Sequence, residues 1–584
     1  MAFAGETAMR SCGLEDVVLF SFHRRRASRS GETDRAFWQL PGARHELLVY
    51  EPKARRRANC RADFALEPLM RSRSLSTRVA TLGALAAAML LALPSGATQA
   101  IEPAATEPAT TRSANAAPLS EVAKRRADNF TLVGRNRLFG RGMNAAPAIY
   151  RDYLYVGNRT DGSPRHSHPG VLVVDIANPK QPRVVGKIGA PNEGNVGETS
   201  RELRVWPQQK MLIVMNFTCS SFIHDCADVP VTPTFKFYDL SGKFAARPRL
   251  LTTYVPPAKP HEMFLWVDPN RSDRALLYYS TPTSEVTGAN LVVADISKAR
   301  DGEVTEVASF NPNRRYPASV RKVRTVALHS LATNPKGNRL YLSYLGGGFL
   351  IADTSDLSRN RKHPRVRLIT PVKNRVRYTN PGVHTAVKVP GRPLAILTEE
   401  VYGDLLDFRD PKSGFVDEEG CPWGWTKIAN ISDPRHPRVV GQYRTRQNHP
   451  SYCSTPAGQN PRNTKFTSYA AHNATVLPNL AFTTWHSSGL QAFSIKNPAQ
   501  PQQTGVFSPR PLRSVTTEDP ALSKGRNKVV MWSYPIIRDG LIYVTDVRNG
   551  LYILRYDGPG AAKVDNIGFY EGNSNLGAAM RLGN

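Results

Sequence analysis

The amino-acid sequence predicts an all-β fold, a β-propeller with seven four-stranded blades. A phrase such as "GVLVVDIANPKQPRVVG" recurs along the chain at intervals of about 60 residues, a period that marks repeats of one structural unit. Between the recurrences, short runs of alternating apolar and polar residues are separated by glycine, proline and asparagine. Almost no stretch has the helical period, so the repeated unit is built from strands.

The recurring phrase has one polar position, at the end of its apolar run. In chain order this position is filled by Asp175, Asp239, Asp295, Asp353, Asn430, Ser494 and Arg555. Seven copies predict seven blades. Because Asn, Ser and Arg replace Asp in the later copies, we interpret the position as a polar strand end rather than a catalytic carboxylate.

Each unit contains the same succession of four short strands, for example "HNATVLP", "LAFTTW", "LQAFSIKNP" and "QQTGVF". Four-stranded units arranged around an axis form a propeller, which protects sheet edges by radial repetition. A solenoid is the alternative, although its repeats are usually shorter. The segment "NFTLVGRNRL" resembles an outer strand but precedes the first unit. One way to close the ring is for this N-terminal strand to complete the last blade.

The segments before the repeats are predicted to lie outside the propeller. Residues 1–69 are rich in arginine without sustained periodicity, and we interpret them as a mis-assigned or disordered leader. Residues 70–100 start with a methionine and basic residues, continue with an apolar run and end with small residues, which is typical of a signal peptide. The apolar run of about 15 residues is short for a membrane span of about 20. An uncleaved anchor is the alternative.

The remainder of the chain divides into three parts. Residues 101–127 are rich in Ala, Pro, Thr and Ser and are expected to be a disordered linker. The propeller is expected at residues 128–570, and a C-terminal tail at residues 571–584. Within the fifth unit, the long acidic insertion "DLLDFRDPKSGFVDEEGCPWGW" replaces a short turn. It is expected to be a surface decoration or a binding loop, because long loops often carry binding sites.

Export changes how the cysteines are interpreted. A cleaved signal peptide predicts a secreted or periplasmic protein, where disulfides form and persist. Four cysteines lie in the exported part, and proximity in sequence favours the pairs Cys219–Cys226 and Cys421–Cys453. The spacing C-x-x-C does not occur, which argues against a thiolate zinc site or a redox motif.

The chain is strongly basic, with a formal net charge of +29. For an exported protein, this charge favours anionic envelope polymers or phospholipid headgroups as partners, with peripheral membrane contact left open. No basic run is interleaved with aromatic residues, so nucleic acid is not an expected partner. The alternative is that the basic side chains only solvate the surface. We expect a monomer.

The units resemble the LVIVD-repeat family of exported β-propellers. The resemblance rests on the strand "VLVVDI", the following turn "NPKQP" and the closing strand "VVG". It covers seven copies, roughly from Asn129 to Asp557, and implies the propeller fold. It implies no particular activity, because the family is defined by its repeat and a fold does not determine function.

The strongest chemical signal is one repeat position in the first strand of each unit. Four consecutive units carry histidine there, namely His261, His329, His384 and His472. Arg201 and Ser533 hold this position in other units, and Ala145 is nearest to it in the first unit. The first strands of propeller blades line the central channel, so we expect these side chains to converge. Converging neutral imidazoles are good ligands for Zn, Cu or Fe.

Charged residues near these histidines are candidates to line the channel or to orient the ligands as a second shell. They are Arg201, Glu202, Glu262, Glu399 and Glu400. Two other interpretations stay open for the histidines, namely hydrogen bonding to the neighbouring blade and a metal-free ligand pocket. His486 lies beside two serines in "TWHSSG", but no nucleophile elbow or matched acid accompanies it.

Two classes of function follow. The first is an exported binding or scaffold module that recognises a protein or an anionic envelope component through loops on one face. The alternative is a metal-dependent enzyme, an oxidoreductase or a hydrolase, that uses the ring of channel histidines. The sequence leaves open whether the protein is an enzyme, and it identifies no catalytic residue.

Overall fold

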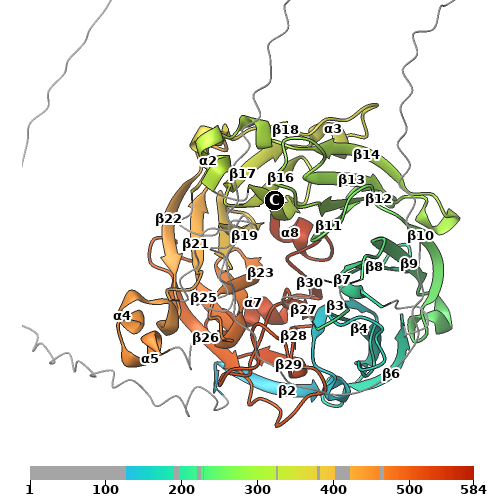
Figure 1. Cartoon of the computed structure of the whole chain (residues 1–584), viewed down its shortest axis with the longest axis vertical. Helices are drawn as coiled ribbons and strands as arrows, with labels where there is room; N and C mark the ends of the chain where they lie inside the picture. Colours follow the sequence, from blue (N-terminus) through green and yellow to red (C-terminus); the bar gives the residue numbers. More distant parts are fainter. Residues whose placement is uncertain are drawn as a thin grey trace, which may run out of the picture. The chain divides into compact units, whose positions relative to one another are not determined.

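The computed structural model describes residues 126–189, 196–219, 225–227, 229–323, 326–377, 382–400, 421–460 and 466–583. Within these residues the chain is an all-β β-propeller, as the sequence predicts, with antiparallel sheets arranged around a common centre (Figure 1). The expected leader and signal peptide, nearly all of the expected linker and most of the acidic insertion lie outside the described residues.

Three separate four-stranded sheets follow one another in the middle of the chain. The first contains β11 (Met263–Asp268), β12 (Arg271–Ser280), β13 (Leu291–Asp295) and β14 (Thr305–Phe310). The second contains β15 (Ala327–Thr333), β16 (Arg339–Leu345), β17 (Gly348–Asp353) and β18 (Arg367–Leu368). The third contains β19 (Val383–Lys388), β20 (Leu394–Glu399), β21 (Thr426–Asn430) and β22 (Arg438–Tyr443).

The N-terminal part forms an eight-stranded sheet that contains two four-stranded sets. The first set is β3 (Asn144–Tyr150), β4 (Tyr153–Asn158), β5 (Val171–Asp175) and β6 (Arg183–Ile188). The second set is β7 (Glu198–Trp206), β8 (Met211–Thr218), β9 (Thr234–Asp239) and β10 (Arg249–Tyr254). The two sets are joined through β4 and β7 by the single pairing of Asn158 with Ser200.

Two five-stranded sheets include strands from the N-terminal end of the described chain. One contains β23 (Ala471–Leu477), β24 (Leu480–Trp485), β25 (Gly489–Ser494), β26 (Gln502–Ser508) and β1 (Arg126–Asp128). The other contains β27 (Ile536–Arg538), β28 (Leu541–Asp546), β29 (Gly550–Tyr556), β2 (Phe130–Asn136) and β30 (Phe569–Tyr570). β2 pairs antiparallel with β29, which is the ring closure expected for the N-terminal strand. The pairing of β1 with β26 was not expected from the sequence.

In the part of the chain that the structure describes, helices are few and short. The α-helices are α2 (Ala318–Val323), α3 (Ser355–Ser358), α4 (Pro450–Cys453), α5 (Pro456–Gln459), α7 (Ala561–Asp565) and α8 (Ala579–Gly583). The 3₁₀ helices are η1 (Leu138–Gly140), η2 (Gly242–Ala245), η3 (Ala299–Asp301), η4 (Asn313–Arg315), η5 (Val372–Asn374), η6 (Arg446–Asn448) and η7 (His486–Ser488). Among the described residues, no helix has the length and apolar character needed to cross a membrane.

The core lies between neighbouring sheets, because both faces of most strands are covered. In β11, Phe264 and Trp266 pack toward the β15–β17 side, whereas Leu265 and Val267 pack toward the β7–β9 side. This division follows from the period of two in a strand, where successive side chains point to opposite faces. A strand that is buried on both faces is a continuous apolar run, which explains sequences such as "MFLWV".

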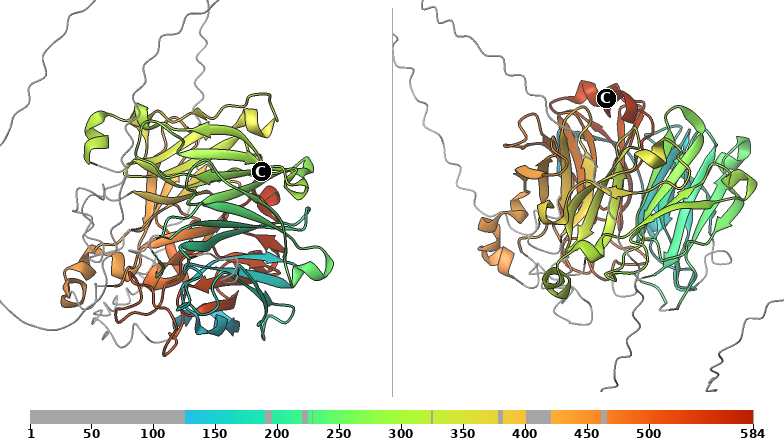
Figure 2. Two further views of the ribbon diagram at one scale, coloured as in Figure 1. Left: turned by 45° about the vertical axis from the view of Figure 1, so that its right-hand side comes forward. Right: turned by 90° about the horizontal axis from the view of Figure 1, so that it is seen from above.

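Two features fix loops and the C-terminal end. The expected disulfides are present, with Cα–Cα distances of 6.3 Å for Cys219–Cys226 and 5.5 Å for Cys421–Cys453. Residues 571–583, expected as a tail, lie against the inner strand β11, where Ser574 bridges to Leu265. Figure 1 shows α8 inside the ring of sheets, and the right-hand view of Figure 2 shows the C-terminal end of the chain at one end of the sheets. It therefore covers one end of the inner strands.

Candidate metal centre

In three of the four units that carry histidine, this repeat position coincides with a β-bulge in the inner strand, whereas His261 lies just before β11 begins. The register of β15 with β16 shifts between Leu328 and Ser330, so His329 is the extra residue. The register of β19 with β20 shifts in the same way at His384. In β23, the shift leaves His472 and Asn473 without a partner residue in β24. The inner strands β7 and β3 have the same irregularity, at Arg201 and at Ala145 and Ala146. A bulge frees the extra residue from the ladder and redirects its side chain.

The four histidines predicted from the sequence lie in one row. Successive ring centroids are separated by 4.4 Å from His261 to His329, 4.2 Å from His329 to His384 and 3.8 Å from His384 to His472. His486, in η7 directly after β24, continues the row at 5.1 Å from His472. His384, His472 and His486 are completely buried.

Glu400 is the carboxylate on which the inner end of this row converges. Its Oε1 atom lies 3.2 Å from Nε2 of His472 and 3.3 Å from Nε2 of His486. Its Oε2 atom lies 3.5 Å from Nε2 of His384. The ligand atoms of His384, Glu400 and His472 all lie within 4.8 Å of one another, so these three side chains can share one metal ion.

The hydrogen bonds of two rings fix which nitrogen carries the proton. Nδ1 of His472 lies 2.7 Å from the carbonyl oxygen of Trp532, which only accepts, so Nδ1 is the donor. Nδ1 of His384 lies 2.7 Å from Oγ1 of Thr385, whose hydroxyl donates to Oδ1 of Asn473. Asn473 is oriented by its own amide, which donates to the carbonyl of Trp532. In both neutral rings, Nε2 is therefore an acceptor that faces the Glu400 carboxylate.

Burial keeps these imidazoles neutral. It lowers the pKa of His329 to about 4 and that of His472 to about 3, because a buried ring loses the solvation of its charged form. Burial also lowers the pKa of His384 well below its usual range, with a further contribution from His472. Burial alone would raise the pKa of Glu400, but His472 and His384 hold it well below its usual range.

A second set of possible ligands lies next to the first. Glu262, His329 and His384 also place their ligand atoms within 4.8 Å of one another. Nε2 of His329 contacts Nε2 of His261 at 2.8 Å, which requires a proton between the two rings. This contact joins His261 to the row through a hydrogen bond and not as a member of either ligand set.

The other charged residues predicted for the channel have separate roles. Glu399 faces away from the histidines and accepts from Nζ of Lys427 at 2.9 Å, and burial raises the pKa of Glu399 to about 7. Glu202 binds the buried Arg204 at 3.2 Å. Burial, and secondarily Glu202, raises the pKa of Glu262 to about 8. Arg201 lies beside a small cavity on the opposite side of the row.

The place of His486 in the row was not predicted from the sequence, which indicated Glu400 only as a candidate to line the channel or to act in the second shell. A second repeat position identifies both residues. "LAILTEE" places Glu400 directly after β20, and "LAFTTWH" places His486 directly after β24. Because the first residue after the second strand lies beside the bulge of the first strand, two repeat positions meet at one site.

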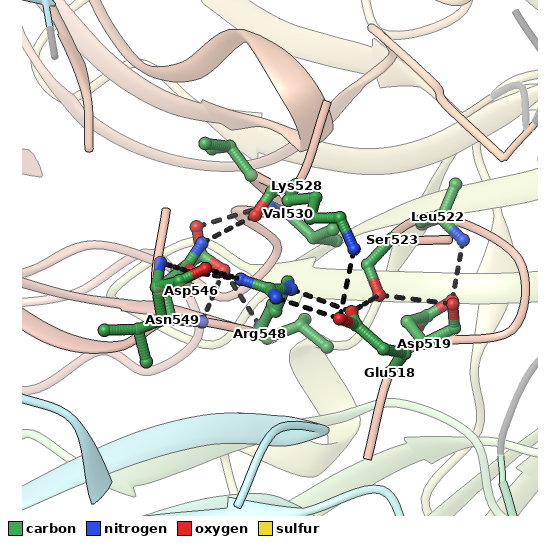
Figure 3. Close-up of polar contacts among 12 residues, drawn as sticks. Glu518, Asp519, Leu522, Ser523, Lys528, Val530, Asp546, Arg548 and Asn549 are labelled. Atoms are coloured by element: carbon green, nitrogen blue, oxygen red, sulfur yellow. Dashed lines mark hydrogen bonds and ion pairs between the residues drawn. The ribbon is translucent and has the colours of Figure 1, made fainter. Parts of the chain in front are cut away.

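A long connection between β26 and β27 supports the site from one side. Glu518 accepts two hydrogen bonds from the guanidinium of Arg548, at 2.7 and 2.8 Å, and one from Lys528 (Figure 3). The side chain of Asp546 accepts from the backbone of Val530, Arg548 and Asn549. These contacts fix the segment that brings the carbonyl of Trp532 to His472.

Comparisons with known proteins find no family and only distant structural likeness. The chain matches no protein-family model and no curated protein sequence. It is similar to the β-propeller domain of Cps50 (Swd1) from Myceliophteria thermophila, with 10% identity, a TM-score of 0.38 and coverage of 74% of this chain and 99% of that one. It is also similar to Sqt1 from Chaetomium thermophilum bound to the N-terminus of the ribosomal protein L10. That match has 10% identity, a TM-score of 0.39 and coverage of 72% and 89%. Likeness at this level carries no argument about function.

Proposed function

We propose that this chain is an exported, seven-bladed β-propeller that binds a divalent transition-metal ion between His384, His472 and Glu400. The observation that carries the proposal is the arrangement of acceptors. Two imidazole Nε2 atoms, each with its proton on Nδ1, face one carboxylate in a buried place. Nε2 of His384, Nε2 of His472 and the Glu400 carboxylate are all acceptors, which repel one another, and burial makes the repulsion costly.

Two chemical states would remove this repulsion. His472 could take up a second proton and pair with Glu400 as an imidazolium, but burial lowers the pKa of His472 to about 3. A cation bound by the three side chains satisfies all the acceptors at neutral pH without a proton. Imidazole nitrogens with a carboxylate oxygen suit Zn, Fe or Cu. The Nδ1 hydrogen bonds then serve as the second shell that orients each ligand.

The placement of the ligands favours a catalytic centre over a structural one. The proposed ligands come from β19, β23 and the residue directly after β20, and the other buried histidines of the row, His329 and His486, come from β15 and the residue directly after β24. Arg201, Arg159 and Trp532 lie around a small cavity. A structural zinc site is closed by protein ligands, whereas a catalytic site keeps a position open. A bound metal would supply Lewis-acid or redox chemistry, so we propose an oxidoreductase or a hydrolase.

The blade number and the export are parts of the same proposal. The two four-stranded sets of the eight-stranded sheet, counted with the five other sheets, support seven blades. The signal peptide predicted at residues 70–100 supports a secreted or periplasmic location. The two disulfides agree with an oxidising compartment.

Metal content tests the proposed function. Residues 101–584, secreted to the periplasm so that both disulfides form, are purified without chelator and analysed by inductively coupled plasma mass spectrometry. We expect close to one equivalent of Zn, Fe or Cu in the wild type and a large loss in His384→Ala and in Glu400→Gln. His436→Ala is the matched control, because His436 is exposed and pairs only with Asp433. A folded wild type that neither contains nor takes up metal would contradict the proposal.

A second candidate function is a binding module for an anionic envelope component. A groove of about 770 Å³ is lined by Arg135, Arg137, Arg510 and Arg513 beside the exposed Phe139. None of these four arginines makes an ion pair with the part of the chain that the structure describes. Clustered cations attract polyanions over long range. Co-sedimentation with an anionic cell-wall polymer would test this function, with Arg510→Gln and Arg513→Gln expected to weaken salt-sensitive binding.

A further inference from the structure

Arg201 is a buried cation without a polar partner in the described part of the chain. Only 3% of the residue is exposed. Its guanidinium makes no hydrogen bond or ion pair with the described residues, and its contacts are the rings of Phe217 at 5.4 Å and Trp532 at 5.6 Å. A buried charge is costly unless it is paired. Arg204, three residues along the same strand, shows the usual solution, because it binds Glu202 and the carbonyl of Met263.

The Arg201 side chain lines a cavity that polar groups also reach. The cavity has a volume of about 10 Å³, and its lining includes Arg159, Asn144, Ser533, Glu202 and Trp532. A volume of about 10–15 Å³ accommodates about one water-sized group. The cavity therefore admits one oxygen of a ligand group, and the rest of that ligand would extend out of it.

The cavity and the histidine row share one wall. The guanidinium of Arg159 lies over the indole of Trp532, 3.4 Å from the ring centroid. The same indole lies 4.6 Å from the ring of His472 and 5.3 Å from that of His486, measured between ring centroids. A group held by Arg201 would therefore lie on the side of the row that has no histidine. Such a position orients a ligand toward the row.

We infer that this cavity binds a carboxylate group, with Arg201 as its anchor. The guanidinium offers paired N–H donors that match a planar carboxylate, and the pair would supply the missing counter-charge. Glu202 also lines the cavity. Its negative charge disfavours a doubly charged anion such as phosphate more strongly than a singly charged carboxylate. The group is the carboxylate of a small acid such as formate or acetate, or the carboxylate end of a longer ligand.

The inference goes beyond the metal site and is tested without metal. Chelator-treated protein is titrated with sodium formate and sodium acetate, and binding is followed by calorimetry and by the shift in Tm. Sodium chloride at equal ionic strength, sodium phosphate and acetamide are the controls. We expect a saturable rise in Tm with the carboxylates and none with acetamide. Arg201→Met should weaken carboxylate binding by about tenfold or more, whereas Arg183→Met, at an exposed position, should leave it unchanged.

The ligand-free variants separate a binding role from a structural one. Because Arg201 lacks a partner, Arg201→Met should unfold at the same temperature as the wild type or at a higher one without ligand. Arg201→Lys keeps the charge but loses the paired donors, so it should bind carboxylates more weakly than the wild type. Saturable binding that survives Arg201→Met, or a lower Tm of that variant with no carboxylate effect in the wild type, would overturn the inference. Binding seen only after metal is restored would also overturn it, because the carboxylate would then be a metal ligand.

Discussion

Nε2 of His472 lies 3.2 Å from Oε1 of Glu400, while Nδ1 of the same ring donates to the carbonyl of Trp532 at 2.7 Å. Because the proton of His472 lies on Nδ1, Nε2 of His472 and Oε1 of Glu400 are two acceptors in contact. The same relationship, at 3.5 Å, holds between His384 and Glu400. These contacts favour a metal centre over the alternative in which each histidine only forms a hydrogen bond with its neighbouring blade.

The second shell should control metal affinity without supplying a ligand. Thr385→Val removes the acceptor that holds Nδ1 of His384, so we expect metal affinity to fall by about 10- to 100-fold. Competition with a chromophoric chelator measures this change. The control is Thr475→Val, in the inner strand β23, which loses a hydrogen bond to Pro535 away from the imidazole row. Equal affinities in the two variants would show that Thr385 does not orient the ring.

Acid should destabilise the metal-free protein. The pKa of His472 is lowered by burial to about 3 and that of His329 to about 4, whereas unfolded histidine titrates near about 6.5. As the pH falls from 6.5 toward 4, the unfolded chain gains protons that the folded chain does not. The stabilisation is therefore complete above about pH 6.5, and the free energy of unfolding falls below it, by up to roughly 1.4 kcal/mol per pH unit for each histidine. Glu400 and Arg201 are the charged groups that act on His329.

Urea unfolding in the presence of chelator, at several pH values, measures this slope. His329→Gln and His472→Asn should each flatten it, and His436→Asn, at an exposed position, should leave it unchanged. A free energy of unfolding that does not change between pH 6.5 and pH 4.5 would contradict the assignment of neutral buried imidazoles.

The C-terminal segment should contribute to the stability of the ring. Asn575 accepts from the backbone N–H of Val267 at 2.8 Å and donates to its carbonyl at 2.7 Å. Asn575→Ala leaves both backbone groups of β11 without this partner, which should cost about 1–3 kcal/mol. Thermal or urea unfolding measures the loss. Asn566→Ala removes an exposed hydrogen bond to Ala562 and serves as the control, with a change expected near zero.

The contacts of Glu518 should support the site through the segment that carries Trp532. Glu518→Ala would leave the buried guanidinium of Arg548 without its carboxylate, and we expect a loss of about 3 kcal/mol. Metal affinity should fall as well, because the carbonyl of Trp532 would be less well fixed. The double variant Glu518→Ala with Arg548→Met should recover part of the stability. No recovery would indicate that the ion pair is not the cause.

The repeat pattern was sufficient to predict the propeller and the row of four histidines, and the proximity of the cysteines in sequence was sufficient to predict both disulfides. Strand periodicity and turn residues are local signals, and they recur from one repeat to the next. The geometry at Glu400 and His486 was not predicted, because it depends on where the second strand of one unit ends beside the bulge of the first. The pairing of β1 with β26 was also missed, since three residues carry no periodic signal. Glu399 was placed with Glu400, although adjacent strand residues face opposite sides.

Anomalous diffraction from crystals of the mature chain at a metal absorption edge tests the metal centre most directly. We predict one strong peak bonded to Nε2 of His384, Nε2 of His472 and a carboxylate oxygen of Glu400, with metal–nitrogen distances of about 2.0–2.1 Å if the metal is zinc. A peak at a different place, or a crystal grown with metal that shows none at these three residues, would contradict the account.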